Sequence, residues 1–220
     1  MRDPDKRVME KAYARWAPVY DVLCGPVFLN GRRAAAQAAR EVGGRILEIG
    51  VGTGLSFDDY DDTTEITGID ISEPMIARAR IRAASGRYPQ VKGLAVMDAH
   101  DLRYPDAAFD CVVGQFVITL VADPERVLSE CARVTRPGGQ IILVNHLYSE
   151  KGFAAAVERL LAQQARNVGL RPEFPFQRLA QWAHAHGGAE LIERRAVKPF
   201  GVYTLVRFRR RALGSAVQAA

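Results

Sequence analysis

Short apolar runs alternate with longer stretches of helical periodicity along the first two thirds of the chain. The apolar runs predict strands over residues 45–49, 65–70, 91–97, 109–116 and 139–146, because they are short and rich in β-branched side chains. Two helical stretches, near 73–86 and 123–135, lie between them. Strands that alternate with helices in this way predict right-handed βαβ units and a parallel sheet.

Local signals mark the ends of these helices. Ser72-Glu73-Pro74 and Asp123-Pro124 each place an N-cap residue before an early proline, which favours a helix start. Arg136-Pro137-Gly138-Gly139 is predicted to be a turn that ends the second helix before the next strand.

The rhythm changes after Asn145. Helical stretches at about 151–168 and 176–187 are separated by the proline-containing segment 170–175. Strands over 189–197 and 201–209 then follow each other with a short turn, as in an antiparallel hairpin. The chain contains no internal repeat, low-complexity segment or long linker. The pattern therefore predicts one α/β domain with a helical insertion before its last two strands.

Composition is that of a soluble globular protein, with 48% apolar and 25% charged residues in 220. Charges throughout the first twenty residues argue against a signal peptide. The longest apolar run, 112–122, is too short to span a bilayer. Cys24, Cys111 and Cys131 lie far apart, which favours reduced thiols in a cytosolic protein.

The net charge of +5 is unevenly placed, with basic clusters in residues 1–16 and 193–211. The second cluster ends in Arg207-Phe208-Arg209-Arg210-Arg211. Such clusters attract anionic partners, either nucleic acid or an acidic membrane surface. The alternative is a solvated face that has no partner.

A glycine-rich loop follows the first predicted strand, in the segment Leu47-Glu48-Ile49-Gly50-Val51-Gly52-Thr53-Gly54. Glycines at such a turn let the backbone approach a ligand closely. A dinucleotide fingerprint would require the next glycine where Leu55 stands. Together with the carboxylate of Glu48, this argues against a pyrophosphate and favours a ligand that carries a sulfonium and an ammonium group.

Two further carboxylates follow the next two predicted strands. Asp70 lies twenty residues after Gly50, a spacing at which an acidic residue can bind both ribose hydroxyls. Asp98 follows the third strand, where it can accept a hydrogen bond from an adenine amino group. Ligands of open α/β sheets bind along the carboxyl ends of the strands. A purely structural turn remains the alternative reading of the glycines.

With these residues the chain resembles the class I S-adenosylmethionine-dependent methyltransferases over nearly its whole length. The resemblance implies a Rossmann-like α/β fold, with a mostly parallel seven-stranded sheet, a C-terminal antiparallel hairpin and helices on both faces. It implies one methyltransferase domain over 1–212, with an N-terminal helix and lid (1–24), a helical insertion near the substrate (147–188) and a tail (213–220). No metal is expected.

The same resemblance assigns roles to individual residues. It implies that Gly50 and Gly52 face the methionine portion of S-adenosylmethionine, that Asp70 binds the ribose, and that Gln115 offers its backbone carbonyl to the methionine amino group. The residues implied at the adenine are Ile71 and Met75 on its face and Asp98 with Ala99 at its edge. His100 is interpreted as a surface or packing histidine rather than a catalyst.

The N-terminal segment narrows the choice of molecule that accepts the methyl group. Tyr13-Ala14-Arg15-Trp16-Ala17-Pro18-Val19-Tyr20-Asp21, together with GVGTGLSF, GIDISEPM and Val144-Asn145-His146, resembles the soluble bacterial phosphatidylethanolamine N-methyltransferases over roughly residues 10–205. This resemblance nominates Tyr13 and Tyr20 as lid contacts to the cofactor. The tyrosine signature is shared with the quinone-ring C-methyltransferases, so it leaves that acceptor open.

Residues 6–17 also predict an amphipathic basic helix that ends before Pro18. Lys11 and Arg15 lie on its basic flank, and Trp16 is suited to headgroup depth in a membrane interface. The alternative is a cofactor lid, and one helix can serve both purposes. The expected location is therefore cytoplasmic, peripherally attached to the inner face of the cell membrane.

The predicted acceptor site lies at the open end of the fifth strand. His146 is the candidate to orient or accept a proton from the amine, with Asn145 or Tyr148 beside it and Tyr20 among the catalytic candidates. Trp16, Tyr20 and Phe116 offer aromatic faces to methylated cations. The candidate phosphate donors are Arg159, Arg166, Arg171 and Arg178.

Three hypotheses remain open at this stage. The first is a peripheral membrane enzyme that methylates phosphatidylethanolamine to phosphatidylcholine. The second is a methyltransferase of a quinone or another small molecule. The third is a nucleic-acid-binding protein with a vestigial pocket, which rests only on the basic C-terminal run. His184 and His186 have no ligand-spaced partner, so no metal site is expected there.

Overall fold

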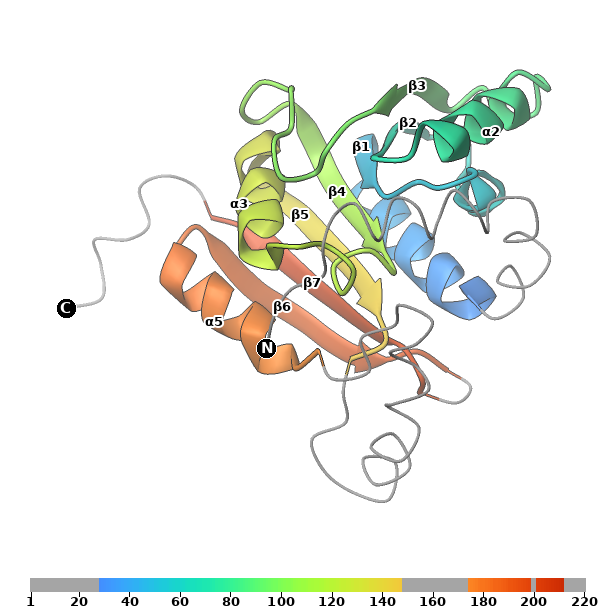
Figure 1. Cartoon of the computed structure of the whole chain (residues 1–220). Helices are drawn as coiled ribbons and strands as arrows, with labels where there is room; N and C mark the ends of the chain where they lie inside the picture. The colour runs from blue at the N-terminus through green and yellow to red at the C-terminus, as the bar shows by residue number, and fades with distance from the viewer. Residues whose placement is uncertain (1–27, 148–173, 199–200, 212–220) are drawn as a thin grey trace.

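The computed structural model describes residues 28–147, 174–198 and 201–211 (Figure 1). Residues 28–42 are helical. The elements that follow are β1 (Gly44–Ile49), the short 3₁₀ helix η1 (Leu55–Asp59), β2 (Thr64–Asp70), α2 (Glu73–Ala83), β3 (Val91–Val96), β4 (Phe109–Gln115), α3 (Pro124–Val134), β5 (Thr135–Asn145), α5 (Phe176–His186), β6 (Ala189–Ala196) and β7 (Thr204–Arg210).

Seven strands form one sheet in the order β3-β2-β1-β4-β5-β7-β6. The five strands from β3 to β5 pair in parallel, whereas β7 is antiparallel to β5 and to β6. The predicted mostly parallel sheet with a C-terminal antiparallel hairpin is therefore confirmed. Because β1 and β4 are adjacent while the chain runs outward from β1 to β3 and then back, their carboxyl ends form the switch point at which ligands of such sheets bind.

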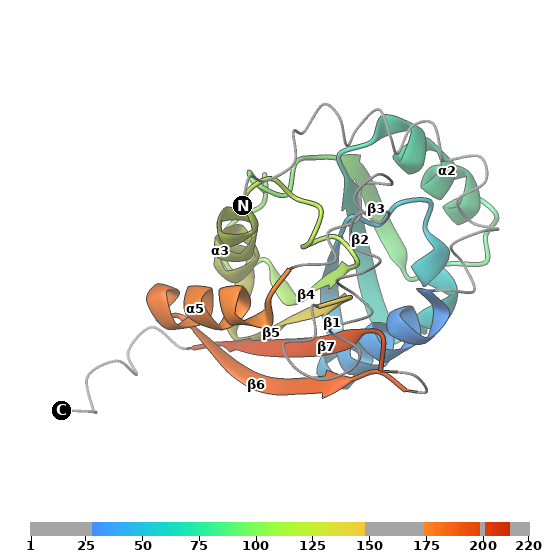
Figure 2. The same ribbon diagram turned by 60° about the horizontal axis from the view of Figure 1, so that its bottom comes forward.

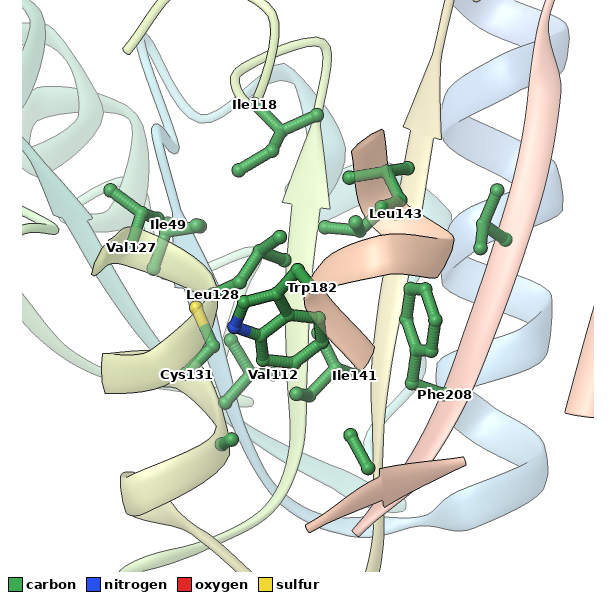
Figure 3. Close-up of a cluster of buried hydrophobic side chains, with 14 of the residues drawn as sticks. Ile49, Val112, Ile118, Val127, Leu128, Cys131, Ile141, Leu143, Trp182 and Phe208 are labelled. Carbon is green, nitrogen blue, oxygen red and sulfur yellow. The ribbon is translucent and has the colours of Figure 1, made fainter. Parts of the chain in front are cut away.

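Helices cover both faces of this sheet, as predicted (Figure 2). Alternate residues of each strand point to opposite faces, so Leu47 and Ile141 contribute to the core beneath α3 and α5, whereas Ile46 and Ile142 meet the helix over residues 28–42. The first of these clusters is the larger, and Figure 3 shows Trp182 of α5 at its centre against strand side chains.

An N-cap position followed by an early proline marks where each predicted helix begins. Asp123 is the N-cap of α3, and its carboxylate accepts a hydrogen bond from the Arg126 backbone N–H at 3.0 Å, with Pro124 in the first turn. Ser72 occupies the N-cap position of α2 and is again followed by an early proline, but its side chain makes no capping hydrogen bond among the described residues. At the C-terminal end of α5, Gly187 adopts the left-handed conformation that commonly ends a helix.

Three local features differ from the sequence predictions. The helix over residues 28–42 was not predicted, because its inward face is built from alanines, which give little periodic contrast. The predicted turn at 136–139 is instead the irregular start of β5, which loses its register with β4 between Phe109 and Cys111. The last strand begins at Thr204 rather than at 201.

Several sequence predictions concern residues outside the described ranges. They are the helices over 6–17 and 151–168 and the tail at 213–220. Among the helices that the structure describes, none combines the length and apolarity that crossing a membrane requires. Cys111 and Cys131 are buried free thiols, and burial raises the pKa of both.

The contact between α5 and the hairpin provides a test of the core. Phe208 of β7 is fully buried, and its ring meets that of Trp182 edge to face with centroids 5.6 Å apart. We expect Phe208→Ala to lower the free energy of unfolding by about 3–5 kcal/mol, because the truncation leaves a cavity. Leu191→Ala on β6, where the side chain is 39% exposed, should cost less than about 1 kcal/mol. Urea unfolding of both variants measures this, and equal losses would contradict it.

Candidate functional site

The glycine loop after β1 has a backbone that only glycine adopts without strain. Gly50, Gly52 and Gly54 all have positive φ, at 67°, 56° and 78°. The backbone N–H of Val51 donates to the Ile69 carbonyl at 2.9 Å, so the loop stays joined to the end of β2. A Cβ added at Gly52 would meet no atom within 4 Å. The loop therefore leaves open space directly above Gly52.

Asp70, the predicted ribose contact, ends β2 beside this loop. Its carboxylate accepts the Gly52 N–H at 3.0 Å through Oδ2 and the Ser72 N–H at 2.9 Å through Oδ1. Burial raises the pKa of Asp70, while the backbone donors of Ser72, Gly52 and Ile71 oppose this shift. A carboxylate has about four lone-pair sites, so two ribose hydroxyls remain compatible with these bonds.

An open hollow lies beside the loop, at the carboxyl ends of β1 and β4. Its walls come from the glycine loop, the two strand ends, η1 and the helix over residues 28–42. The lining residues are Phe28, Arg32, Glu48, Gly50, Val51, Gly52, Thr53, Leu55, Ser56, Gln115 and Phe116. The structure thus brings together the four residues predicted at the methionine end, namely Glu48, Gly50, Gly52 and Gln115.

Glu48 is a buried carboxyl in the wall of this hollow, with 2% of the residue exposed. Burial raises its pKa from 4.5 to about 7, and the hydroxyls of Ser56 and Tyr60 oppose that rise. The charge of Asp59 raises the pKa of Glu48 further, whereas the charge of Arg32 lowers it. Its Oε2 atom has no hydrogen-bond partner among the described residues. Glu48 is therefore a buried acceptor that a cationic ligand would stabilise in its ionised form.

Two other buried amides have unsatisfied atoms at the same edge. Gln115 donates through Nε2 to the Tyr60 hydroxyl at 3.3 Å, but its Oε1 has no partner within the described part of the chain. Asn145 is buried, with 2% of the residue exposed, and neither its Oδ1 nor its Nδ2 has a hydrogen-bond partner among the described residues. Unsatisfied buried polar atoms are rare in native proteins and call for an explanation. A ligand with several polar groups would supply it.

These features fit the S-adenosylmethionine that the sequence predicts. Buried acceptor atoms of Glu48 and Gln115 suit the ammonium group of its methionine portion, and the open space above Gly52 admits the backbone of that portion. Asp70 lies next to Gly52 along the same edge, as a ribose contact requires. The roles of these residues remain predictions, while their placement around one site is what the structure shows.

The predicted adenine residues continue along the edge toward β3. Ile71 follows β2 and is 37% exposed, whereas Met75, in the first turn of α2, is 2% exposed. Asp98 and Ala99 follow β3 and are partly buried. The Asp98 carboxylate contacts His100, whose Nδ1 lies 2.6 Å from Oδ1. His100 therefore has a defined contact within the predicted cofactor site, which the sequence reading as a packing residue did not reveal.

The predicted acceptor residues lie at the end of β5. His146 Nδ1 is 2.8 Å from the Val202 carbonyl, which can only accept, so Nδ1 carries the hydrogen of a neutral ring. Phe116 has a positive φ of 58° and packs its ring on Phe28 at 4.4 Å and on Tyr203 at 4.9 Å. An aromatic group therefore stands between the hollow and the β6–β7 turn.

The remaining predicted site residues divide into two groups. The lid, substrate and membrane candidates Lys11, Tyr13, Arg15, Trp16, Tyr20, Tyr148 and Arg166 lie outside the described residues. Arg178, a candidate phosphate donor, instead pairs with Glu125 and so joins α5 to α3. No group of three or more His, Cys, Asp or Glu residues within the described ranges could hold a metal ion.

Sequence reasoning missed Phe28 and Arg32 in the wall of the hollow, and Tyr60 behind that wall. Phe28 and Arg32 come from the helix that was not predicted, and Arg32 pairs with Asp59 at 2.9 Å. Tyr60 lies behind Glu48, and burial is the main cause of the rise in its pKa. The clustering of Arg32, Asp59 and Tyr60 near Glu48 has no sequence signature, because Arg32, Glu48 and the pair Asp59-Tyr60 come from three separate segments.

Comparison with known proteins places this chain in a family. Residues 47–143 match the methyltransferase domain model. The phosphatidylethanolamine N-methyltransferase of Cereibacter sphaeroides is 42% identical over 92% of this chain and 98% of its own length. The demethylmenaquinone methyltransferase of Thermus thermophilus is 34% identical over 69% of this chain and 72% of its own length.

Solved structures agree on the fold. A Thermotoga maritima S-adenosylmethionine-dependent methyltransferase, described as a possible histamine N-methyltransferase, superposes with a TM-score of 0.69 at 20% identity, over 92% of this chain and all of its own. A putative methyltransferase in complex with the Haloferax volcanii Trm112 activator superposes with a TM-score of 0.74 at 18% identity. The superposition covers 91% of this chain and 98% of that one.

The open space above Gly52 generates a first prediction for the site. We expect Gly52→Ala to weaken S-adenosylhomocysteine binding at least tenfold, because the new methyl group enters the ligand's space. Gly86→Ala is a matched control, since Gly86 has φ 77° and equally open surroundings but lies after α2, away from the hollow. Both variants should lose about 1–2 kcal/mol of stability from left-handed strain. Calorimetric titration compares them, and unchanged affinity in Gly52→Ala would contradict the placement.

The raised pKa of Glu48 generates a second prediction for the site. Between about pH 4.5 and 7 the folded protein keeps a proton that the unfolded chain loses, so the stability contributed by Glu48 falls as pH rises through that window. A shift from 4.5 to about 7 corresponds to about 3 kcal/mol. Glu48→Gln should therefore be more stable than the native protein at pH 8, by up to that amount.

The same group should link cofactor binding to pH. A cationic ligand favours ionised Glu48, so the affinity for S-adenosylmethionine should fall as pH drops below about 7 and level off above it. In Glu48→Gln this dependence should disappear between pH 5.5 and about 7.5. Thermal unfolding and calorimetry over this range measure both effects. An identical pH profile in the native protein and in the variant would show that Glu48 does not face the ligand's charge.

Proposed function

Because this chain belongs to the class I S-adenosylmethionine-dependent methyltransferases, we propose that it methylates the amine of phosphatidylethanolamine and of its methylated intermediates, forming phosphatidylcholine. The observation that carries this proposal is the 42% identity to a phosphatidylethanolamine N-methyltransferase across 92% of this chain and 98% of that relative. Partial matches share the domain, whereas this one is long enough to extend through the predicted acceptor residues Asn145 and His146.

The amine must reach the reaction without its proton. A primary amine has a pKa of about 10.4, so holding it neutral at pH 7 costs roughly 4–5 kcal/mol. The cofactor supplies an activated methyl group on sulfur, and the amine's lone pair must point at that carbon. An apolar surrounding lowers an amine's pKa, and the ring group of Phe28, Phe116 and Tyr203 provides such a surrounding beside the hollow.

His146 is the residue that we assign to the amine. Since its Nδ1–H donates to the Val202 carbonyl, the lone pair of the neutral ring is on Nε2, the atom that can accept from a substrate N–H. The contact to Val202 also fixes the ring relative to the β6–β7 turn. Aromatic faces at Phe116 and Tyr203 suit the cations that form after each methylation.

The membrane is the proposed partner, and the basic helix predicted over residues 6–17, with Lys11, Arg15 and Trp16, supports it. The chain would then act at the inner face of the cell membrane. Support for nucleic acid is weaker, because Arg207 pairs with Glu41 and Glu193, and Arg210 donates to main-chain carbonyls. These contacts within the chain explain part of the basic C-terminal run, so that part needs no nucleic-acid partner.

A quinone ring is the second candidate acceptor. The match to a demethylmenaquinone methyltransferase over 69% of this chain supports it. Such a ring is methylated at carbon and has no basic amine, so it needs no neutralising environment. The two acceptors can therefore be separated by a direct assay.

The assay supplies a methyl-labelled donor with vesicles that contain phosphatidylethanolamine and an anionic lipid, or with demethylmenaquinone in the same vesicles. We expect label in mono-, di- and trimethylated lipid and none in the quinone. Label in the quinone alone, or in neither extract, would refute the proposal.

Variants of His146 extend this assay. We expect His146→Ala to reduce turnover at least about 100-fold while leaving the affinity for S-adenosylhomocysteine unchanged. His184→Ala on α5, where the side chain is exposed, is the matched control and should be fully active. His146→Gln separates two roles, since it can orient the amine but cannot take its proton. Full activity in His146→Ala would remove this residue from the mechanism.

A further inference from the structure

His100 holds the Asp98 carboxylate through two contacts to one oxygen. Its backbone N–H donates to Asp98 Oδ1 at 3.0 Å, and its ring Nδ1 lies 2.6 Å from the same oxygen. The two side chains are 18% and 29% exposed, so the contact is partly shielded from water. Two donors from one residue fix both the position and the plane of the carboxylate more narrowly than one could.

The second ring nitrogen of His100 is held from the opposite side. The Asp123 backbone N–H donates to Nε2 at 3.1 Å. Because Nε2 accepts, Nδ1 must be the nitrogen that carries hydrogen in the neutral ring, and it donates to Asp98. The start of α3 therefore selects the tautomer that Asp98 needs.

A fourth contact closes this arrangement. The Arg126 Nε–H donates to the His100 carbonyl at 2.8 Å, and the Arg126 backbone N–H is capped by the Asp123 carboxylate at 3.0 Å. His100 is thus fixed at its N–H, its carbonyl and both ring nitrogens. A histidine that only filled space at the surface would not need four polar contacts of defined direction.

We propose that His100 is a positioning residue for the cofactor's adenine, holding the Asp98 carboxylate in the orientation that accepts the adenine amino group, with Asp123 of the α3 cap setting its tautomer. The role is distinct from catalysis, since His100 acts on the ligand only through Asp98. It depends on S-adenosylmethionine binding at this edge and not on which acceptor is methylated.

The test measures how strongly the protein prefers adenine over a purine without the amino group. The ligands are S-adenosylhomocysteine and its analogue with hydrogen in place of the 6-amino group, and the readout is the ratio of their dissociation constants. Hydrogen bonds to a charged acceptor contribute about 1.5–3 kcal/mol, so we expect the native protein to prefer the amino ligand by about 10- to 100-fold.

Two substitutions separate the contacts of the ring. In His100→Asn the side-chain amide can donate from the position of Nδ1, so the contact to Asp98 is kept. In His100→Gln the longer side chain places its amide near the position of Nε2, so the contact to the Asp123 N–H is kept and that to Asp98 is lost. We expect His100→Asn to retain the native preference within about threefold and His100→Gln to lose about tenfold of it.

Thermal unfolding of both variants controls for a merely structural role. If His100 only stabilised the fold, the preference for adenine would follow the melting temperature rather than the retained contact. A native ratio in His100→Gln, or equal losses in both variants, would overturn the proposal.

Asp98→Ala provides the reference state. In this variant the ratio of the two dissociation constants should fall to about one. Adding His100→Gln should change that ratio no further, because the two residues act as one unit. A native ratio in Asp98→Ala would show that Asp98 does not read the amino group, and a further drop in the double variant would show that His100 acts by another route. Either result overturns the proposal. Since no methyl acceptor is present, the outcome is independent of the proposed lipid substrate.

Discussion

The hydrogen bonds of Asp70 hold the candidate site in shape. Its carboxylate receives the N–H of Gly52 from the glycine loop and that of Ser72 from the start of α2. One partly buried side chain therefore joins the ends of β1 and β2 to the start of a helix. Bonds of this kind to a charged acceptor contribute about 1.5–3 kcal/mol each, enough to hold the loop in the left-handed conformations that glycine tolerates. The hollow beside Gly52 exists because the loop is held open in this way.

The two ends of the site differ in how their polar atoms are satisfied. At the ends of β1, β4 and β5, the side chains of Glu48, Gln115 and Asn145 bury atoms that lack hydrogen-bond partners within the described residues. Near β3, Asp98 and His100 already form a connected set with Asp123. Buried groups without partners destabilise a free protein, and a ligand that satisfies them recovers that energy. The methionine end therefore gains most from binding, whereas the adenine end is built before the ligand arrives.

Sequence reasoning was strongest where local patterns dictate structure. All seven strands and the start of α3 at Asp123 follow from periodicity and capping, and the glycine spacing with Asp70 located the edge at which the hollow lies. It failed where contact depends on tertiary packing. The alanine-rich helix over residues 28–42 gives little periodic contrast, yet it brings Phe28 and Arg32 into the hollow. The role of His100 was missed because its partners Asp98 and Asp123 meet only after folding.

A crystal structure with S-adenosylhomocysteine bound tests the placement of the cofactor most directly. We predict the ammonium group of the ligand within hydrogen-bonding distance of Glu48 or Gln115, both ribose hydroxyls on Asp70, and the adenine amino group on Asp98. An adenine ring bound away from Asp98, or a ribose without contact to Asp70, would contradict the site as described here.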